Sequence, residues 1–164
     1  MAELLDRGVI TTRVFPHDRT LVYSAWTEPE LVTQWWGPAG FTDTLIAHDL
    51  KPGGRWRHIL HGPDGTVYPN LAVFTEVVPP ERLGFRHYTT TEPQGEPNYT
   101  NLTTFDLAPT GTRVRMQMLF ASPEHWSAAR DVVVPKNEEN FDKLGALLDR
   151  VQARGATRPA GPGG

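Results

Sequence analysis

Histidine is the residue with the widest chemistry in this chain, because a neutral imidazole binds metals and exchanges protons near pH 7. Six histidines occur, and their spacing contains no HxH or HExxH pattern that would set two ligands on one metal. His58 and His61 are three positions apart in a predicted strand, so their side chains point to opposite faces. The chain contains no cysteine, which excludes disulfides, thiolate zinc sites and a cysteine nucleophile. The sequence therefore predicts no metal site and no cofactor.

Three titratable side chains, His58, His87 and Tyr68, are expected on the inner face of a predicted sheet. General acid–base catalysis needs such a group inside a pocket. A histidine in a mainly apolar cavity also serves to orient the polar end of a ligand, so both interpretations stay open for His58 and His87. No GxSxG nucleophile elbow is present, and Gly53 and Gly54 close a hairpin instead of opening a helix. That arrangement excludes a Rossmann or P-loop phosphate site.

Apolar side chains that could line a cavity accompany these histidines. Trp35 and Trp36 end a predicted helix, and Trp56 leads a strand after a Pro-Gly-Gly turn. Met116 and Met118 share one face of a strand and supply a flexible, polarizable wall. The residues predicted to bind a ligand are Trp35, Trp36, Trp56, His58, Tyr68, Phe85, His87, Met116, Met118 and Trp126.

The composition is that of an ordinary globular protein, with 164 residues of which 38% are hydrophobic and 10% aromatic. We expect one domain over residues 1–154 and a disordered tail over residues 155–164, which has nothing to bury. The net charge of -3 argues against nucleic acid as a partner. No export signal is visible, and no run approaches the roughly 20 apolar residues of a membrane span. A cytoplasmic protein without a membrane span is the expectation.

Helical and strand signals alternate along the first third of the chain. Residues 9–15 mix β-branched and polar residues and predict a first strand, which Pro16 ends. Asp18 is expected to cap a short helix. A capping box, with Thr27 at the N-cap and Glu30 three residues later, predicts a second short helix.

From residue 42 the pattern of turns and strand-like segments is that of an antiparallel meander. Turn signals recur between strand-like segments at residues 44–50, 55–61, 66–77, 82–89, 99–107 and 112–120. The polar segment 90–98 is long for a hairpin and is expected to gate the mouth of a cavity. After Phe120 the period is helical again, with a short helix to Ala129 and a longer one from Pro135.

This order of elements predicts an α+β architecture. A curved seven-stranded antiparallel sheet wraps around a long C-terminal helix, with two short helices after the first strand. A gap between sheet and helix would be a cavity.

The chain resembles the START-like (SRPBCC) superfamily, whose helix-grip fold is also called birch-pollen-allergen-like. Within it, the similarity is to the branch of the activator of Hsp90 ATPase homologue C-terminal domain. The resemblance covers residues 9–154 and rests on Ala-Trp-Thr-Glu-Pro-Glu at 25–30, Trp-Trp-Gly-Pro at 35–38 and Pro-Gly-Gly at 52–54, in this order. Ala72 stands where the branch usually has glycine.

The resemblance implies a function in binding apolar molecules. Members of the superfamily bind lipids, sterols and polyketides, and a minority are cyclases, aromatases or hydrolases. We expect a carrier, sequestering or sensing protein for a small hydrophobic or amphipathic ligand. One alternative is a metal-free cyclase/aromatase-type enzyme acting on a polyketide-like substrate through His58 or His87. The other is a chaperone-cofactor-like interaction module with a chaperone partner. A homodimer through a sheet edge or an exposed apolar patch is also compatible with the sequence.

Overall fold

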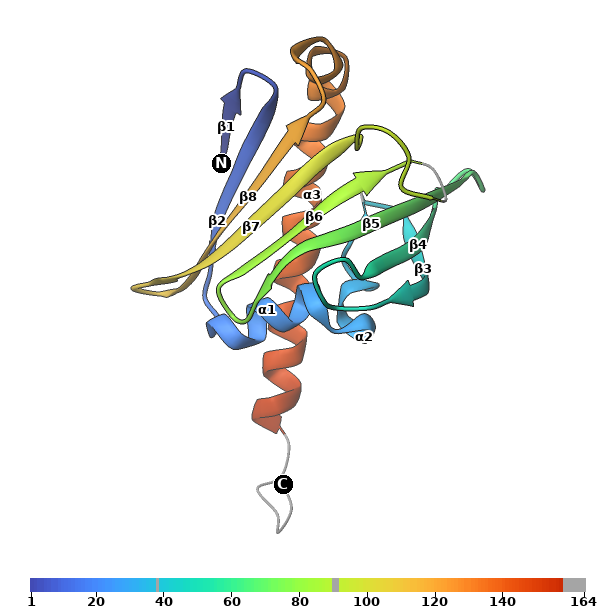
Figure 1. Cartoon of the computed structure of the whole chain (residues 1–164). Coiled ribbons are helices and arrows are strands. Elements are labelled where there is room, and N and C mark those ends of the chain that lie inside the picture. Colours follow the sequence, from blue (N-terminus) through green and yellow to red (C-terminus); the bar gives the residue numbers. More distant parts are fainter. Residues whose placement is uncertain (38, 90–91, 158–164) are drawn as a thin grey trace.

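The computed structural model describes residues 1–37, 39–89 and 92–157. A single antiparallel sheet in the order β1-β2-β8-β7-β6-β5-β4-β3 curves around one long helix, α3 (Figure 1). The strands are β1 (Ala2–Leu5), β2 (Gly8–Phe15), β3 (Thr42–His48), β4 (Arg55–His61), β5 (Val67–Val78), β6 (Arg82–Tyr88), β7 (Tyr99–Ala108) and β8 (Gly111–Phe120). The predicted α+β helix-grip fold is confirmed.

The sheet has eight strands and not the predicted seven. The additional strand, β1, pairs with β2 through a hairpin, with Ala2 opposite Thr11 and Leu5 opposite Gly8. This segment has only four residues and lies at the sheet edge, so its sequence carries too little alternation to reveal a strand. The remaining strands follow the predicted meander.

The two short helices follow β2. Helix α1 (Arg19–Thr27) begins at the predicted cap, where the Asp18 carboxylate accepts a hydrogen bond from the Thr20 backbone N–H. The predicted capping box at Thr27 is wrong, because Thr27 is the last residue of α1 and its hydroxyl donates to the Tyr23 carbonyl. Helix α2 (Pro29–Val32) begins instead after Glu28, whose side chain makes no capping bond.

The C-terminal helix α3 (Pro123–Thr157) is continuous through Pro135, whereas the sequence predicted two helices. Proline removes one backbone hydrogen bond and strains the preceding turn. Packing outweighs that cost, because Trp126 before Pro135 and Phe141 after it are both buried in the one core. Of the predicted tail, residues 155–157 continue α3 and residues 158–164 lie outside the described residues.

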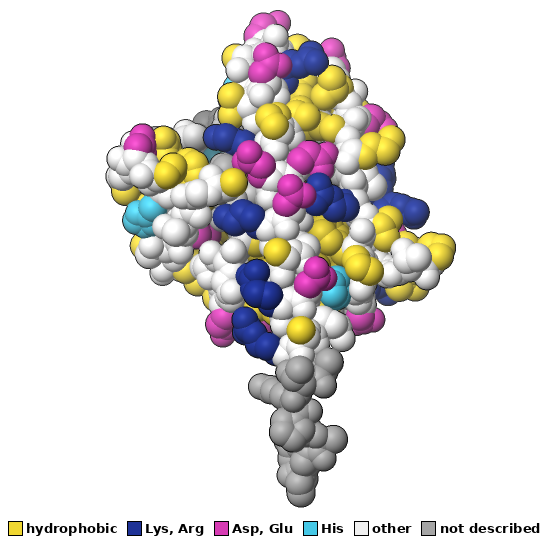
Figure 2. Space-filling model, turned by 180° about the vertical axis from the view of Figure 1, so that it is seen from behind, with side chains coloured by type: hydrophobic (Ala, Val, Ile, Leu, Met, Phe, Trp, Pro, Cys, Tyr) yellow, Lys and Arg dark blue, Asp and Glu magenta, His cyan; other side chains and the backbone are white. Residues whose placement is uncertain are grey.

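Hydrogen bonds fasten helix α3 to strand β2 and to the segment between α2 and β3. On β2, the Arg13 guanidinium binds the carboxylates of Glu138 and Asp142, each at 2.7 Å. On the other side, the Asn140 side-chain oxygen accepts a hydrogen bond from the Gly37 N–H at 3.1 Å. The face of the molecule turned toward the viewer in Figure 2 carries interspersed acidic and basic side chains. None of the described helices is long and apolar enough to cross a membrane.

The inner face of the sheet carries a row of large side chains that faces α3. Cross-strand pairing aligns Trp56, Ala72, His87, Tyr99 and Phe120 from β4 to β8. All but Tyr99 are buried, and Tyr99 packs against the buried core. Successive strand residues point to opposite faces, so this row fixes which side chains enter the interior.

Substitution of two glycines, Gly54 and Gly145, tests the backbone geometry at a turn and in α3. A Cβ at Gly54 would lie 2.0 Å from the Asp49 carbonyl oxygen, whereas one at Gly145 in α3 meets nothing closer than 3.7 Å. We expect Gly54→Ala to lower the free energy of unfolding by about 1–3 kcal/mol through overpacking. Gly145→Ala should raise it by about 0.5–1 kcal/mol, because alanine loses less entropy in a helix. Urea unfolding followed by circular dichroism measures both, and a stabilising Gly54→Ala would contradict the turn geometry.

Candidate ligand-binding site

Most of the residues predicted to bind a ligand are buried on the inner side of the sheet or against it. Eight of them, which we call the interior set, belong to this region: Trp36, Trp56, His58, Phe85, His87, Met116, Met118 and Trp126. Trp35 is also fully buried, but it packs on Trp26 at 4.6 Å between ring centroids and donates its indole N–H to the Ala25 carbonyl. Its contacts are those of a core residue beneath α1.

Tyr68 does not share this interior. Its side chain is 45% exposed and lies against Phe41, with ring centroids 5.8 Å apart. The reason is the length of β5, whose first residues extend beyond the buried part of the sheet. Strand alternation alone placed Tyr68 on the inner face. Alternation does not show how many residues of a strand are covered by the rest of the protein.

Three aromatic rings form the wall at the β4 end of the interior. Trp36 contacts Trp56 at 5.3 Å and Phe85 at 6.1 Å, and Trp56 contacts Phe85 at 5.6 Å, measured between ring centroids. All three contacts are edge-to-face, which is a favoured arrangement for aromatic pairs. The Trp36 side chain reaches this wall from the segment after α2, and the other two come from the sheet.

A buried acid–histidine pair adjoins this wall. Nδ1 of His58 lies 3.0 Å from Oδ1 of Asp43, and the two side chains are 2% and 0% exposed. The His58 imidazole stacks on Trp56 with ring centroids 4.6 Å apart. A carboxylate accepts and does not donate, so Nδ1 carries a proton in this bond. Nε2 of His58 has no hydrogen-bond partner among the described residues.

Asp43 was missed by the sequence analysis, although a signal for it existed. The predicted strand began at Thr44, two residues too late, whereas β3 begins at Thr42. Asp43 has the same parity as Leu45, whose partner across the ladder is His58. An acidic residue is uncommon within a strand, so an inward Asp there indicates a buried polar contact.

A cation that acts on this pair comes from α3. Lys143 donates to the Gly37 carbonyl at 3.2 Å and to the Phe41 carbonyl at 3.5 Å. Burial lowers the pKa of Lys143, and the negative charges of Asp43 and Glu139 act in the opposite direction. The Asp43 carboxylate therefore has a positive charge within electrostatic reach.

His87 differs from His58 because both of its ring nitrogens have partners. Nε2 lies 2.5 Å from Oδ1 of Asn70, and Nδ1 lies 3.4 Å from Nδ2 of Asn98. An amide oxygen accepts and an amide nitrogen donates, so the ring carries its proton on Nε2. Burial, and to a lesser extent the nearby His58, lowers the pKa of His87 to about 3. This imidazole stays neutral near pH 7 and has no free nitrogen, so His58 is the stronger of the two candidates for chemistry.

Several other buried polar atoms lack a partner among the described residues. They include Nε1 of Trp56, Nδ2 of Asn101, Oδ2 of Asp43 and Nε2 of His48. Asn101 lies on the inner face opposite Phe85 and Met118, and its side-chain oxygen accepts from the Thr103 hydroxyl. Each unpaired buried group costs about 1–3 kcal/mol.

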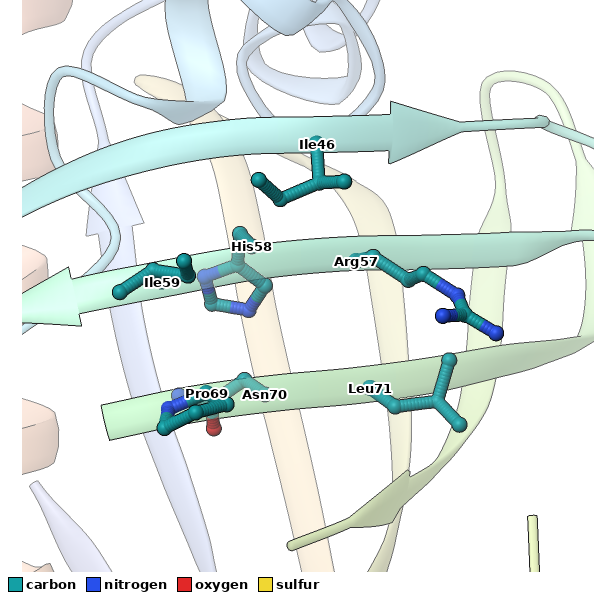
Figure 3. Close-up of a pocket in the computed structure, with 7 residues that line it drawn as sticks. All are labelled: Ile46, Arg57, His58, Ile59, Pro69, Asn70 and Leu71. Carbon is teal, nitrogen blue, oxygen red and sulfur yellow. The ribbon is translucent and has the colours of Figure 1, made fainter. Parts of the chain in front are cut away.

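A pocket of about 170 Å³ lies against β3, β4 and β5 (Figure 3). It is lined by Ile46, Arg57, His58, Ile59, Pro69, Asn70 and Leu71. Arg57, Ile59 and Leu71 alternate in sequence with His58 and Asn70, so their side chains lie on the outer face of the sheet. This pocket therefore lies mainly on the outer face, although the inner-face residues His58 and Asn70 also line it.

The segment predicted to gate the cavity contacts both faces of the sheet. Glu92 binds the outer-face guanidinium groups of Arg55 and Arg57 at 2.8 and 2.9 Å. Asn98, at the other end, contacts His87 on the inner face. A second hollow, of about 240 Å³, lies between this segment and the start of α3. Residues 90–91 of the predicted gate lie outside the described residues.

Among the described residues, no group of three or more histidine, aspartate or glutamate side chains could hold a metal ion. The interior set is a buried, largely aromatic cluster with a small number of polar atoms. These atoms offer hydrogen bonds, and one histidine nitrogen offers a lone pair.

An antiparallel sheet that grips one long helix and buries polar atoms between them defines an SRPBCC-type helix-grip domain. Residues 16–149 match the family model described as Activator of Hsp90 ATPase homolog 1-like protein. The match covers most of the chain, which therefore belongs to this family. No curated protein matches the chain.

Solved structures of several bacterial proteins share the fold. A Mycobacterium smegmatis protein aligns with a TM-score of 0.82 and 26% identity, over 92% of this chain and 98% of that one. An Arthrobacter aurescens protein aligns with a TM-score of 0.82 and 21% identity, over 92% and 91%. The AHSA1-like protein of Aeromonas hydrophila aligns with a TM-score of 0.71 and 20% identity, over 88% and 94%.

The buried His87 predicts a pH dependence of stability. Its pKa is about 3 in the folded chain and 6.5 without burial, so between these values the unfolded chain binds a proton that the folded chain does not. The free energy of unfolding should therefore fall as the pH falls, by up to about 1.4 kcal/mol per pH unit from this residue. His87→Gln should flatten this dependence between pH 6 and 4, as measured by urea unfolding. An NMR titration of the His87 ring near pH 6.5 would contradict the assignment.

Proposed function

We propose that this chain binds a small hydrophobic or amphipathic molecule between its sheet and α3. The observation that carries the proposal is the set of unpaired polar atoms inside an apolar interior. Trp56 and Asn101 each keep a hydrogen-bond donor unpaired there. A ligand oxygen that accepted from either donor would remove its desolvation cost, which gives the interior a preference for a molecule with a polar group.

The walls of the interior supply the apolar part of such binding. Met116 and Met118 lie on the inner face of β8, opposite Thr103 and Asn101. Methionine side chains have several rotatable bonds and adapt to ligands of different shape. Each Å² of apolar surface removed from water contributes about 25 cal/mol, so a ligand of modest size gains substantial affinity from these walls.

An entrance for the ligand is supported by the hollow between the segment after β6 and the start of α3. His125 and Asn98 are among its lining residues, together with Tyr88, Thr89, Gln94, Glu96, Pro97 and Ala121. His125 packs on Phe120 with ring centroids 5.3 Å apart, and Phe120 also contacts Trp126 at 5.3 Å. Movement of these rings would connect the hollow to the inner face.

Opposite effects on stability and binding are expected when the unpaired amide is removed. The double variant Asn101→Leu with Thr103→Val replaces a buried polar pair by apolar side chains of similar volume. We expect the free energy of unfolding to rise by about 1–3 kcal/mol, because an unsatisfied buried amide is lost. Ligand occupancy should fall, since the ligand loses a hydrogen-bond donor.

Occupancy is measured by native mass spectrometry of protein purified from its own cells, followed by organic extraction of the bound molecule. Thr104→Val is the matched control, because its buried hydroxyl oxygen is also unpaired but lies on the opposite face of β7. It should leave occupancy unchanged. Equal occupancy in the double variant and the wild type would remove the support that the unpaired donors give to the proposal.

A second candidate function, proton abstraction by His58, is favoured by its contact with Asp43. An oriented imidazole with a free Nε2 is suited to act as a general base. In such a step the proton of a C–H bond next to a ketone moves to Nε2, and the indole N–H of Trp56 donates to the enolate oxygen. Return of the proton to carbon restores the ketone, so no co-reactant is consumed.

Hydrogen–deuterium exchange of β-tetralone in D2O tests this second candidate. Wild-type protein should accelerate exchange at the carbons next to the ketone, and mass spectrometry detects the uptake. His58→Gln should abolish the acceleration, while His61→Gln on the same strand should preserve it. Binding of β-tetralone without accelerated exchange would rule out the base and leave the binding function in place.

A further inference from the structure

The hydrogen bond from His58 to Asp43 determines what the free side of the imidazole offers. Because Nδ1 donates its proton to the carboxylate at 3.0 Å, the neutral ring has its lone pair on Nε2. No described residue donates to this lone pair. The histidine therefore presents an unused acceptor to a molecule that reaches its ring.

The Asp43 carboxylate of this pair has a cation within electrostatic reach. Asp43 is completely buried, and the Lys143 ammonium acts on it electrostatically. An uncompensated carboxylate in a buried site is strongly unfavourable, and the ammonium together with the imidazole N–H stabilises it.

A donor stands next to this acceptor. The Trp56 indole stacks on the His58 ring with an interplanar angle of 15°, and its Nε1–H has no partner among the described residues. The two groups lie at the edge-to-face wall of Trp36 and Phe85. A hydroxyl group donates one hydrogen bond and accepts others, so it complements both groups.

Building on the proposed function, we propose that the interior site is specific for a neutral hydroxylated ring compound, whose hydroxyl donates to Nε2 of His58. The flat aromatic wall favours a ring over a flexible chain. A carboxylate ligand is disfavoured, because it would face the lone pair of Nε2 with Asp43 directly behind it. His87 is not the anchor, since Asn70 and Asn98 already engage both of its nitrogens.

Three matched probes test the inference by isothermal titration at pH 7: β-naphthol, its methyl ether and β-naphthoate. Wild-type protein should bind the naphthol about tenfold more tightly than the ether, which corresponds to one hydrogen bond. It should bind the naphthoate least tightly. His58→Phe should make the affinities for naphthol and ether equal, whereas His61→Phe, on the opposite face of the same strand, should retain the preference.

The tautomer supplies a readout that a merely structural role would not change. Nitrogen-15 NMR should show the free His58 ring protonated at Nδ1, with the Nε2 resonance shifting when naphthol is added. Asp43→Asn lets the amide donate to Nδ1, which allows the proton to move to Nε2. This variant should lose or reverse the preference for naphthol over the ether.

The outcomes separate the inference from the proposed function. Equal binding of naphthol and ether by the wild type, or a His58 ring protonated at Nε2, would overturn the hydroxyl inference and leave the binding function standing. Failure of all three probes to bind would contradict both. If His58→Phe does not fold, the nitrogen-15 NMR spectrum of the wild type and the titrations of Asp43→Asn test the hydroxyl inference.

Discussion

The cover that α3 gives to the inner face of the sheet is the constraint on which the interior depends. The helix is fixed at one side by the bonds from Arg13 to Glu138 and Asp142, and at the other by the bond from the Gly37 N–H to Asn140. Between these attachments, every inner side chain must either pack or find a partner, because water is excluded. Most inner side chains pack through aromatic contacts. A few keep unpaired polar atoms, and these atoms supply the hydrogen-bonding groups of the interior.

Two buried histidines on neighbouring parts of the same sheet illustrate how partners decide function. His87 lies between two asparagine side chains, which use both nitrogens and keep the ring neutral. His58 has one acidic partner and one nitrogen free of described partners. The hydrogen bonds of His87 are complete, whereas His58 keeps one nitrogen that a ligand could use. Their burial is nearly the same, so burial alone would not distinguish them.

The sequence was sufficient to predict the inner face because strand alternation has a fixed period. It correctly placed Trp56, Phe85 and Met116 in the interior. It could not predict the contact between Asp43 and His58, because that contact depends on the register between strands and on a strand start that was predicted two residues too late. The exposure of Tyr68 and the unbroken α3 through Pro135 were also missed. Both depend on how far the tertiary packing extends, which local propensity does not encode.

Family membership and interior chemistry are therefore separate levels of information. The helix-grip fold follows from turns, strand periods and one amphipathic helix, all of which tolerate many interior side chains. In the proposed function a small number of polar atoms select the ligand, so a change of Asp43 or Asn101 is expected to alter the selection without altering the fold. Natural sequences are consistent across levels except where function requires otherwise. The unpaired donors of Trp56 and Asn101 are such an exception, since an apolar residue at either position would serve the core better.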